Sequence, residues 1–279
     1  MLQNFRRLWR SSRRECKELR QEIEELRAIV TALQIRQDLD AGLFDAFLEA
    51  RASSDYQAVF TEPEPLVSIC IATYNLADLL IQRSVASILN QTWRNFELIV
   101  VGDACTDHTA EAMAHITDPR VRFFNLPERG RYPDDKLLRW MVAGTVPMNF
   151  ALAQTRGSLI THLDHDDEHP PDRIAKLVAF LQRERADLVW HPFFHERRAG
   201  QWRLNQAHHF ALGRVTTSSI LYHHWLKRIP WDLGAYRYHQ PGDWNRLAKM
   251  QAIGVRMARF PEPLLRHYLE GKQRSNHPS

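Results

Sequence analysis

The chain has 279 residues, of which 44% are hydrophobic and 10% aromatic, so it is long enough to bury a substantial core. Three cysteines are too few for a disulfide framework, and we expect a reducing, cytoplasmic compartment. The net charge of +4 originates in residues 1–20 and leaves the remainder nearly neutral, which argues against nucleic acid as a partner. The sequence also lacks an apolar run long enough to span a bilayer and the hydrophobic core of a signal peptide.

Residues 1–60 are predicted to form a basic N-terminal segment followed by an amphipathic helix. Its apolar residues recur at spacings of three and four, a heptad pattern typical of coiled coils; they are Cys16, Leu19, Ile23, Leu26, Val30 and Leu33. Only about three heptads are present, so we expect the helix either to pair with a second copy as a homodimer or to pack on its own domain. Arginines interleaved with Phe5, Leu8 and Trp9 suggest peripheral contact with the anionic inner face of a membrane.

The main domain is predicted to begin after a short spacer. Residues 61–65 read TEPEP, a stiff and extended sequence, so we place a linker there and the main domain at residues 66–279. Within that domain, strands are predicted at 66–72, 96–101, 121–125 and 159–163, and helices at 78–90 and 107–116. This alternation indicates an α/β fold with a mainly parallel sheet covered by helices.

The segment SLITHLDHDDEHPP, residues 158–171, is the most informative part of the sequence. A short apolar strand ends there in four carboxylates, Asp164, Asp166, Asp167 and Glu168. One interpretation is a helix cap, because acidic residues favour a helix N-terminus and a helix is expected from about Pro170. The other is a divalent-cation site, since alternate residues of an extended backbone point to one side and Asp164 and Asp166 can then face one ion.

Two further polar clusters follow predicted strands. Thr73, Tyr74 and Asn75 come after the first strand, and residues 102–107, which include Asp103, come after the second. Ligands bind at the carboxyl ends of parallel strands, so the three clusters together favour a binding site, although each alone is also typical of turns and helix caps. The sequence contains neither a G-x-G-x-x-G nor a P-loop motif, which leaves a metal ion to handle any phosphate.

From about residue 67 to about residue 268 the chain resembles the family 2 glycosyltransferases, which have the nucleotide-sugar-binding GT-A fold. Four ordered motifs carry the resemblance: VSICIATYN, IVVGDACTDHT, the A-x-N, A-x-G and LDxDD run from residue 143 to residue 174, and QPGDWNRLAKM. The resemblance implies a nucleotide-binding half over about residues 66–168 and an acceptor half over about residues 169–270.

Carried over to this sequence, the resemblance assigns the nucleotide site. Thr73, Tyr74 and Asn75 would line the nucleotide, Asp103 would accept a hydrogen bond from the base, and Asp164 would lie near the ribose and the metal. Because the family's acidic residue at the position of Asp103 bonds uracil N3, a uridine diphospho-sugar is the implied donor.

The resemblance also assigns the metal and the chemistry. Asp166, with Asp164, would ligate a divalent cation, Mn²⁺ or Mg²⁺, and His267 is a candidate third ligand. Asp243 would be the general base that activates an acceptor hydroxyl in a single inverting displacement, although Asp243 is also typical of a helix N-cap. Trp244 and Asn149 would shape the acceptor or sugar pocket.

Some positions depart from the family pattern. Gly102 stands where an Asp is frequent, and Pro147-Met148 replaces the usual small-Arg pair before Asn149, so Arg129, Arg131 or Lys136 become candidates for the diphosphate contact. The implied acceptor is a glycan or lipid-linked hydroxyl. The competing hypotheses are a sugar nucleotidyltransferase and a catalytically inactive, transferase-like interaction module.

Overall fold

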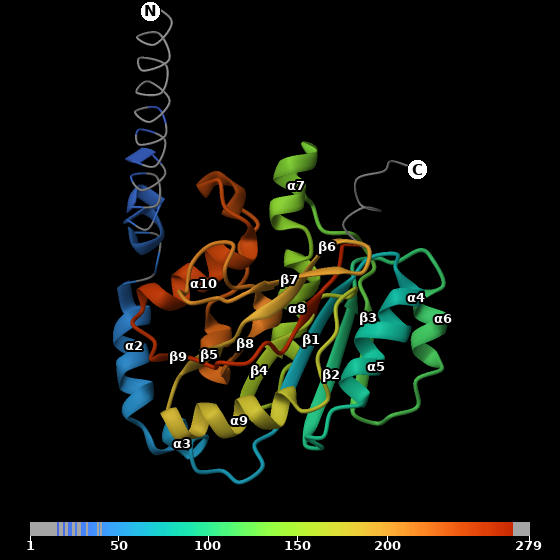
Figure 1. Cartoon of the computed structure of the whole chain (residues 1–279), viewed down its shortest axis with the longest axis horizontal. Coiled ribbons are helices and arrows are strands. Elements are labelled where there is room, and N and C mark those ends of the chain that lie inside the picture. The colour runs from blue at the N-terminus through green and yellow to red at the C-terminus, as the bar shows by residue number, and fades with distance from the viewer. Residues whose placement is uncertain are drawn as a thin grey trace, which may run out of the picture.

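The structure is a computed structural model that describes residues 41–269 and individual residues between 16 and 39. Its centre is a seven-stranded sheet with the strand order β3-β2-β1-β4-β8-β5-β9. Those strands are β1 (Val67–Thr73), β2 (Phe96–Gly102), β3 (Val121–Asn125), β4 (Leu159–His162), β5 (Leu188–Trp190), β8 (Ile220–His223) and β9 (Met257–Arg259). Figure 1 shows the strands side by side, with the loops that follow β1 and β2 at one edge of the sheet.

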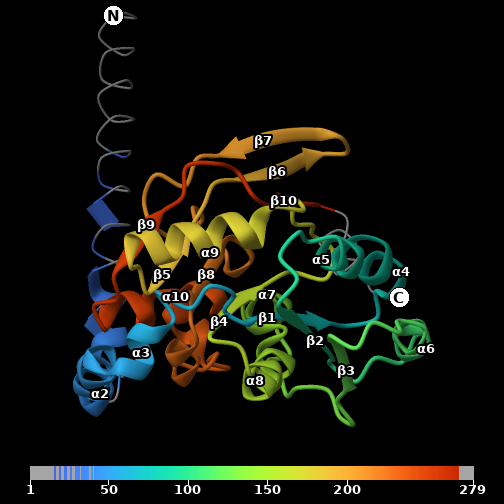
Figure 2. The ribbon, with the colours of Figure 1, turned by 90° about the horizontal axis from the view of Figure 1, so that it is seen from below.

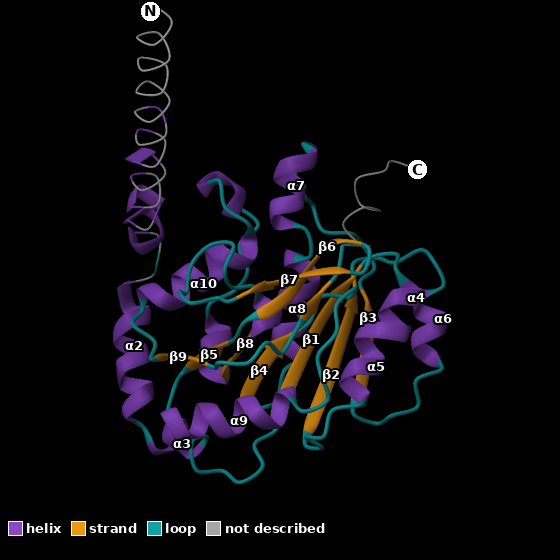
Figure 3. Ribbon diagram, in the orientation of Figure 1, coloured by secondary structure: helices purple, strands orange, loops and turns teal. Residues whose placement is uncertain are grey.

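Helices cover both faces of this sheet. The helices of the described residues are α2 (Ala41–Ala52), α3 (Ser54–Ala58), α4 (Ala77–Leu79), α5 (Ala86–Leu89), α6 (Thr109–Ala114), α7 (Lys136–Val142), α8 (Thr145–Gln154), α9 (Arg173–Glu184) and α10 (Gly242–Ala252), of which α7 projects beyond the strand ends (Figure 1). Short helical turns complete the set: η1 (Leu80–Val85), η2 (Thr217–Ser219), η3 (His224–Arg228) and η4 (Ala235–Tyr238). Figure 2 shows α8 and α9 on opposite sides of the sheet, and Figure 3 shows the same layers by secondary structure.

The sequence explains why β1 and β2 lie in the middle of the sheet. Their sequences, VSICIAT and FELIVVG, have no polar alternation, and every residue of both strands except Ala72 is buried. A strand that is covered on both faces needs apolar side chains on both faces. The predicted α/β fold with a mainly parallel sheet is confirmed, and within this sheet β8 runs antiparallel to both β4 and β5.

The predicted helix at 78–90 is built from three consecutive segments. It runs through α4, the π-helical turn η1 and α5. A π-helical turn widens the helix locally and shifts the direction in which its side chains point. In this chain the turn presents Arg83 and Ser84 to the loop that follows β4.

A second, three-stranded sheet lies beside the main one, with the order β10-β6-β7. It consists of β6 (Phe193–Arg198), β7 (Gln201–Asn205) and β10 (Arg266–His267). An isolated antiparallel bridge joins Glu168 to Arg266 and so ties this sheet to the loop after β4. The small sheet thereby carries His267 to the carboxyl edge of the main sheet.

Residues 41–60 share the core of the residues that follow them. Phe47, Tyr56 and Phe60 are buried in the same hydrophobic cluster as the strands of the main sheet. The Tyr56 hydroxyl donates a 2.8 Å hydrogen bond to the buried Asp187 carboxylate, and the Tyr56 ring stacks on His223 with 3.6 Å between ring centroids. α2 and α3 therefore pack on the main sheet through both apolar and polar contacts.

His223 makes the stability of this packing dependent on pH. Its Nδ1 accepts from the Trp225 backbone N–H and its Nε2 donates to the Tyr56 carbonyl, which is the pattern of a neutral ring. Burial lowers the pKa of His223 from 6.5 to about 3. Between those two values the unfolded chain binds a proton at this position and the folded chain does not, so stability falls as the pH falls below 6.5.

We predict that the free energy of unfolding decreases from pH 7 to pH 5, and that His223→Gln makes this decrease shallower by up to about 1.4 kcal/mol per pH unit. Urea denaturation at a series of pH values measures both slopes. His108→Gln, at an exposed histidine, is the matched control and should leave the slope unchanged. Equal slopes for the wild type and the His223→Gln variant would contradict the prediction.

Candidate functional site

The loop after β4 is fixed by side chains from distant parts of the chain. The Ser84 hydroxyl lies 3.1 Å from the Asp164 carbonyl oxygen and 3.0 Å from that of Asp167, and Arg83 donates a 2.7 Å hydrogen bond to the Asp166 carbonyl. From the other side, the Ser218 hydroxyl accepts from the Asp164 backbone N–H at 3.1 Å. The backbone of the acidic loop is thus clamped between η1 and η2.

Two carboxylates and one imidazole meet at this loop. Asp164, Asp167 and His267 each offer a ligand atom, and among the described residues these three atoms lie within 4.8 Å of one another. His267 Nδ1 donates to Asp167 Oδ2 at 2.6 Å, and Asp167 Oδ1 accepts from the Tyr268 backbone N–H at 2.8 Å. Carboxylate oxygens with one imidazole suit Mn²⁺ or Mg²⁺, so the residues present fit a divalent cation.

Asp166 lies in the same loop but outside that group of three. Its side chain is buried, and its backbone carbonyl accepts the Arg83 hydrogen bond. The assignment of Asp166 as the principal metal ligand remains a prediction. The structure instead groups Asp164 with Asp167, which the sequence analysis did not assign to the metal, and with His267, which it named as a candidate.

Thr73 and Tyr74 lie where β1 ends. The Thr73 hydroxyl forms a 3.1 Å hydrogen bond with His165 Nδ1, which connects β1 to the acidic loop. Burial lowers the pKa of His165, against the opposing effect of Asp166 and Asp167. Tyr74 is 37% exposed, and the Arg129 guanidinium stacks 3.7 Å from the centre of its ring. Tyr74 therefore offers an aromatic surface at the edge of the sheet.

Asn75 joins the two loops that follow β1 and β2. It has a positive φ of 48°, a conformation that Asn adopts more easily than most residues. Its Oδ1 accepts from the backbone N–H groups of Thr106 (2.8 Å) and Asp107 (3.3 Å), and its Nδ2 donates to the Thr106 hydroxyl. The side chain thus holds the loops in place, whether or not it also faces a nucleotide.

Asp103 is buried and holds the loop at residues 129–132. Its Oδ1 accepts from the Gly130 backbone N–H at 3.0 Å and its Oδ2 from the Tyr132 hydroxyl at 2.8 Å, with Arg129 Nε 3.8 Å away. Burial and then the Asp103 charge raise the pKa of Tyr132, so the hydroxyl stays a donor at neutral pH. Because each carboxylate oxygen has two lone pairs, Asp103 retains capacity for a further donor such as a base N–H.

The glycine that replaces a frequent Asp of the family has a local explanation. A Cβ at Gly102 would lie 2.4 Å from Asn125 Oδ1. That oxygen accepts from the Cys105 backbone N–H at 2.8 Å and so shapes the loop after β2. There is no room for a side chain at residue 102 in this arrangement.

The residues assigned to the acceptor side lie on other elements. Asp243 is in the first turn of α10, where its Oδ1 accepts from the Trp244 backbone N–H at 2.7 Å. Trp244 packs against Phe210, with 5.8 Å between ring centroids. α10 contacts η2, which holds Asp164, so Asp243 belongs to an element adjacent to the acidic loop.

Asn149 has a structural partner. Its amide donates to the Trp231 carbonyl at 2.9 Å and accepts from the Trp231 backbone N–H at 2.8 Å, which fastens the loop before η4 to α8. It also lines a surface cavity of about 410 Å³ with Lys227 and Pro230. Its assignment to the sugar pocket remains a prediction.

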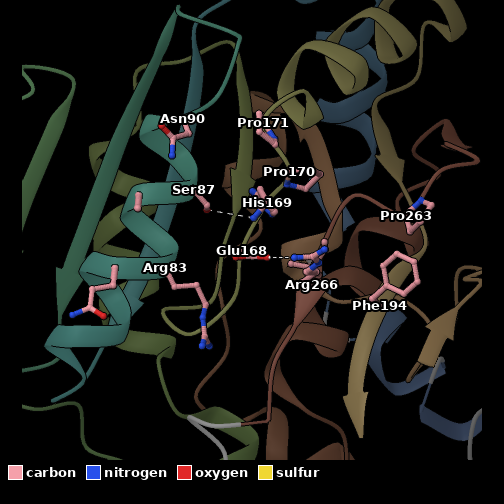
Figure 4. A pocket seen from close by; sticks show the side chains of 13 residues that line it. Arg83, Ser87, Asn90, Glu168, His169, Pro170, Pro171, Phe194, Pro263 and Arg266 are labelled. Carbon is pink, nitrogen blue, oxygen red and sulfur yellow. Dashed lines mark hydrogen bonds and ion pairs between the residues drawn. The ribbon is translucent and has the colours of Figure 1, made fainter. Parts of the chain in front are cut away.

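A larger cavity of about 450 Å³ adjoins the acidic loop on the side of Glu168. Figure 4 shows Arg83 of η1, Ser87 of α5 and Asn90 just after α5 facing it, opposite Arg266, which forms a 2.9 Å ion pair with Glu168. Its lining includes none of the three residues Asp164, Asp167 and His267. The cavity therefore borders the acidic loop without opening onto that group.

Several site residues were not found from the sequence. Arg83, Ser84, Ser218 and Tyr132 hold the loops through hydrogen bonds that span between 29 and 83 positions in the chain. None of these four residues lies in a sequence motif that would predict a role at the site. A single signal was present for Ser84, a small polar residue within an otherwise amphipathic helical pattern, and that signal alone is weak.

A mainly parallel sheet with one reversed strand, whose strands end in acidic and polar loops beside a carboxylate–histidine group, defines a GT-A type nucleotide-sugar transferase fold. The chain matches the family described as "Glycosyl transferase family 2" over residues 68–133 and 146–239, more than half of its length. The chain belongs to this family, and the predicted resemblance is confirmed.

Relatives and solved structures agree with this placement. The chain is 35% identical over 123 residues to the succinoglycan biosynthesis protein ExoO of Rhizobium meliloti, a match that covers 44% of this chain and 30% of that protein. It is 31% identical over 132 residues to the Escherichia coli UDP-Glc:alpha-D-GlcNAc-diphosphoundecaprenol beta-1,3-glucosyltransferase WfaP, covering 47% of each. The chain spans less than half of the length of the curated relatives it matches.

Two solved structures share the fold. One is S. aureus TarS 1-349 in complex with UDP-GlcNAc, with a TM-score of 0.56 and 17% identity over 72% of this chain and 58% of that one. The other is the mannosyltransferase PcManGT from Pyrobaculum calidifontis in complex with GDP-Man and Mn²⁺, with a TM-score of 0.55 and 20% identity over 85% of this chain and 68% of that one. At this identity the likeness shows the GT-A fold alone.

We predict that Asn75→Ala lowers the free energy of unfolding by about 1–3 kcal/mol, because two backbone N–H groups lose their acceptor. The same variant should bind uridine diphosphate more weakly, since the loops after β1 and β2 are no longer joined. Urea denaturation and calorimetric titration measure the two effects. Asn90→Ala, at an exposed residue, is the control. Unchanged stability in the Asn75→Ala variant would show that the side chain does not hold the loops.

Proposed function

We propose that this chain is an inverting, metal-dependent glycosyltransferase that moves a sugar from a uridine diphospho-sugar to a hydroxyl of a glycan or lipid-linked acceptor. The observation that carries the proposal is the group formed by Asp164, Asp167 and His267 at the carboxyl edge of the sheet. Membership of glycosyl transferase family 2 and the shared fold of TarS and PcManGT, solved with UDP-GlcNAc and with GDP-Man and Mn²⁺, support it.

The proposed metal site uses two kinds of contact. Asp164 would be a direct ligand together with the imidazole of His267, and Asp167 would orient that imidazole through its 2.6 Å hydrogen bond to Nδ1. A histidine ligand commonly donates its other ring N–H to a carboxylate in this way. Asp166 is the further carboxylate assigned from the family motif. A cation bound there would stabilise the charge that develops on the leaving diphosphate.

Protein side chains are proposed to bind the nucleotide and to take the proton from the acceptor. Asp103 accepts from the base, with Thr73 and Tyr74 beside the nucleotide, and Asp243 takes the proton from the acceptor hydroxyl as that oxygen attacks the anomeric carbon. Of the three candidate cations, Arg129, Arg131 and Lys136, we choose Arg129 because its guanidinium stacks on Tyr74 and its Nε lies 3.8 Å from Asp103. It is the proposed partner of the donor's negative charge.

The names of two relatives bear on the acceptor. WfaP is named for transfer to a diphosphoundecaprenol-linked sugar, and ExoO for succinoglycan biosynthesis. These names support a surface glycan or a lipid-linked acceptor. From the basic sequence of residues 1–20 we further propose a peripheral contact with the cytoplasmic face of the membrane. Among the described residues, no helix has the length and apolar character that a membrane span requires. Residues 1–15 lie outside the described residues.

We predict that Mn²⁺ strengthens the binding of uridine diphosphate, and that Asp167→Asn weakens Mn²⁺ binding by about 10–100-fold because His267 loses its charged acceptor. Calorimetric titration with and without Mn²⁺ measures both affinities, and circular dichroism checks the fold of the variant. Asp172→Asn, at a half-exposed carboxylate before α9, is the matched control. Equal Mn²⁺ affinity in the wild type and the Asp167→Asn variant would remove Asp167 from the site.

We predict that Asp243→Asn lowers kcat by about 10²–10⁴-fold and leaves the affinity for donor nucleotide unchanged, because a general base acts on the acceptor rather than on the donor. Release of nucleoside diphosphate from a panel of nucleotide sugars measures turnover, with Asp134→Asn at an exposed residue as the control. Full activity in the Asp243→Asn variant would exclude it as the base.

The same assays separate the competing hypotheses. A sugar nucleotidyltransferase would release pyrophosphate from a nucleoside triphosphate and a sugar phosphate, whereas a glycosyltransferase releases a nucleoside diphosphate. An inactive interaction module would bind neither nucleotide nor metal. Retention of Asp103, Asp164, Asp166 and Asp243 favours the transferase.

A further inference from the structure

The segment between residues 16 and 37 exposes a row of apolar side chains. Its described residues are helical, and large apolar side chains there remain about half exposed: Leu19 57%, Ile23 47%, Leu26 61%, Val30 52% and Leu33 57%. Figure 1 shows the described part of this segment beyond the end of α2, away from the main sheet. Burying such a row would be favourable, so an uncovered row indicates a binding surface.

The buried face of this helical segment is not the face that carries the exposed apolar row. Thr31 and Ile35 are 9% and 1% exposed, and they lie four positions apart on one face of the helix. At 100° per residue this face is rotated by roughly 140° from the row formed by Leu19, Ile23, Leu26, Val30 and Leu33. For the described residues, the structure therefore favours an external partner over packing of this row on its own domain.

The residue types in the row specify the kind of partner. With Ile23 and Val30 at heptad position a, Leu19, Leu26 and Leu33 occupy position d. β-branched residues at a with leucine at d favour two parallel strands over three or four. Apart from Ile29 at position g, which is 56% exposed, the row is two positions wide per heptad, which suits a helix partner better than the broader apolar face of a helix that lies on a membrane.

The charges that flank the row favour the same arrangement. In the sequence, Glu15 and Glu22 occupy position g, and Arg20 and Arg27 occupy the following position e. In a parallel pair, position g of one helix faces position e of the next heptad on the other helix, so acid would face base. In an antiparallel pair over residues 16–33, Arg20 at position e of one helix would lie beside Arg27 at position e of the other, so like charges would meet.

We propose that residues 16–37 pair with the same segment of a second copy of this chain as a parallel, two-stranded coiled coil. The proposal is independent of the proposed function, because it concerns only this helix and needs no substrate. It also predicts where the free Cys16 lies. Cys16 is exposed and occupies position a one heptad before Ile23, so it would face Cys16 of the second copy across the pair.

The first test is the mass of the full chain in solution, measured by sedimentation equilibrium. We expect a concentration-dependent species of twice 32.7 kDa, and a monomer for the double variant Ile23→Glu, Val30→Glu. Ala28→Glu, which places the same charge at position f outside the row, is the matched control and should remain dimeric. Ile23 and Val30 are exposed, so thermal unfolding followed by circular dichroism should be the same for the main domain of the wild type and the double variant.

The second test determines the orientation of the helices by oxidation with copper phenanthroline. In the parallel pair the two Cys16 thiols form a disulfide, and a dimer appears on a non-reducing gel for the wild type but not for Cys16→Ser or the double variant. An antiparallel pair over residues 16–33 would separate the two thiols by roughly 26 Å, at 1.5 Å per residue, and give no such band.

Three results would overturn the proposal. A wild-type chain that stays monomeric at its highest soluble concentration would exclude pairing through this row, as would a monomer that instead sediments with vesicles of anionic lipid. A dimer that persists in the double variant would place the contact elsewhere. A dimer whose Cys16 residues do not cross-link, while thiol titration shows them reduced and reactive, would exclude the parallel register.

Discussion

The acidic loop after β4 brings four carboxylates within five residues of chain, and the structure around it compensates for their repulsion. Two unit charges 4 Å apart repel each other by about 4 kcal/mol near a protein surface. Glu168 pairs with Arg266 at 2.9 Å, and Asp167 accepts from His267 at 2.6 Å. Arg83 donates to the backbone of the same loop, which brings a further positive charge close to it. These contacts allow the loop to keep its charge at the edge of the sheet.

The side chains that compensate the charge of the acidic loop come from two elements that are far apart in the sequence. One is the π-helical turn η1 between α4 and α5, which supplies Arg83 and Ser84. The other is β10, whose pairing with β6 and whose bridge to Glu168 bring Arg266, His267 and Tyr268 to the loop. The guanidinium of Arg83 also stacks 3.7 Å from the centre of the Tyr268 ring, so the two elements meet over the loop. The small second sheet thus serves to complete the site that the main sheet begins.

The other loops at this edge are held by side chains that the family resemblance assigns to the ligand. Asn75 joins the loops after β1 and β2, and Asp103 holds the backbone and the Tyr132 hydroxyl of the loop that follows β3. A polar side chain that fixes a loop is itself fixed, so it meets a ligand without a further loss of conformational freedom. The structural and the proposed binding roles of these residues are therefore compatible.

The order of elements and the chemistry of the loops were determined by the sequence alone. Continuous apolar runs such as VSICIAT specify strands buried on both faces, and polar residues directly after them specify the edge where a ligand binds. The predicted strands at 96–101 and 121–125 agree with β2 and β3 to within one residue. Local pattern is sufficient here because apolar periodicity and turn residues act over a few positions.

Only the tertiary structure decided which carboxylates share a site and which residues support them. Strict D-x-D spacing favoured Asp164 with Asp166, whereas the fold places Asp164 near Asp167 and near His267, 100 positions away from Asp167. The short strands β5 to β10 and the packing of residues 41–60 on the sheet were likewise absent from the prediction. Contacts between distant segments depend on how the whole chain packs, and two residues that meet in this way leave no common pattern in the sequence.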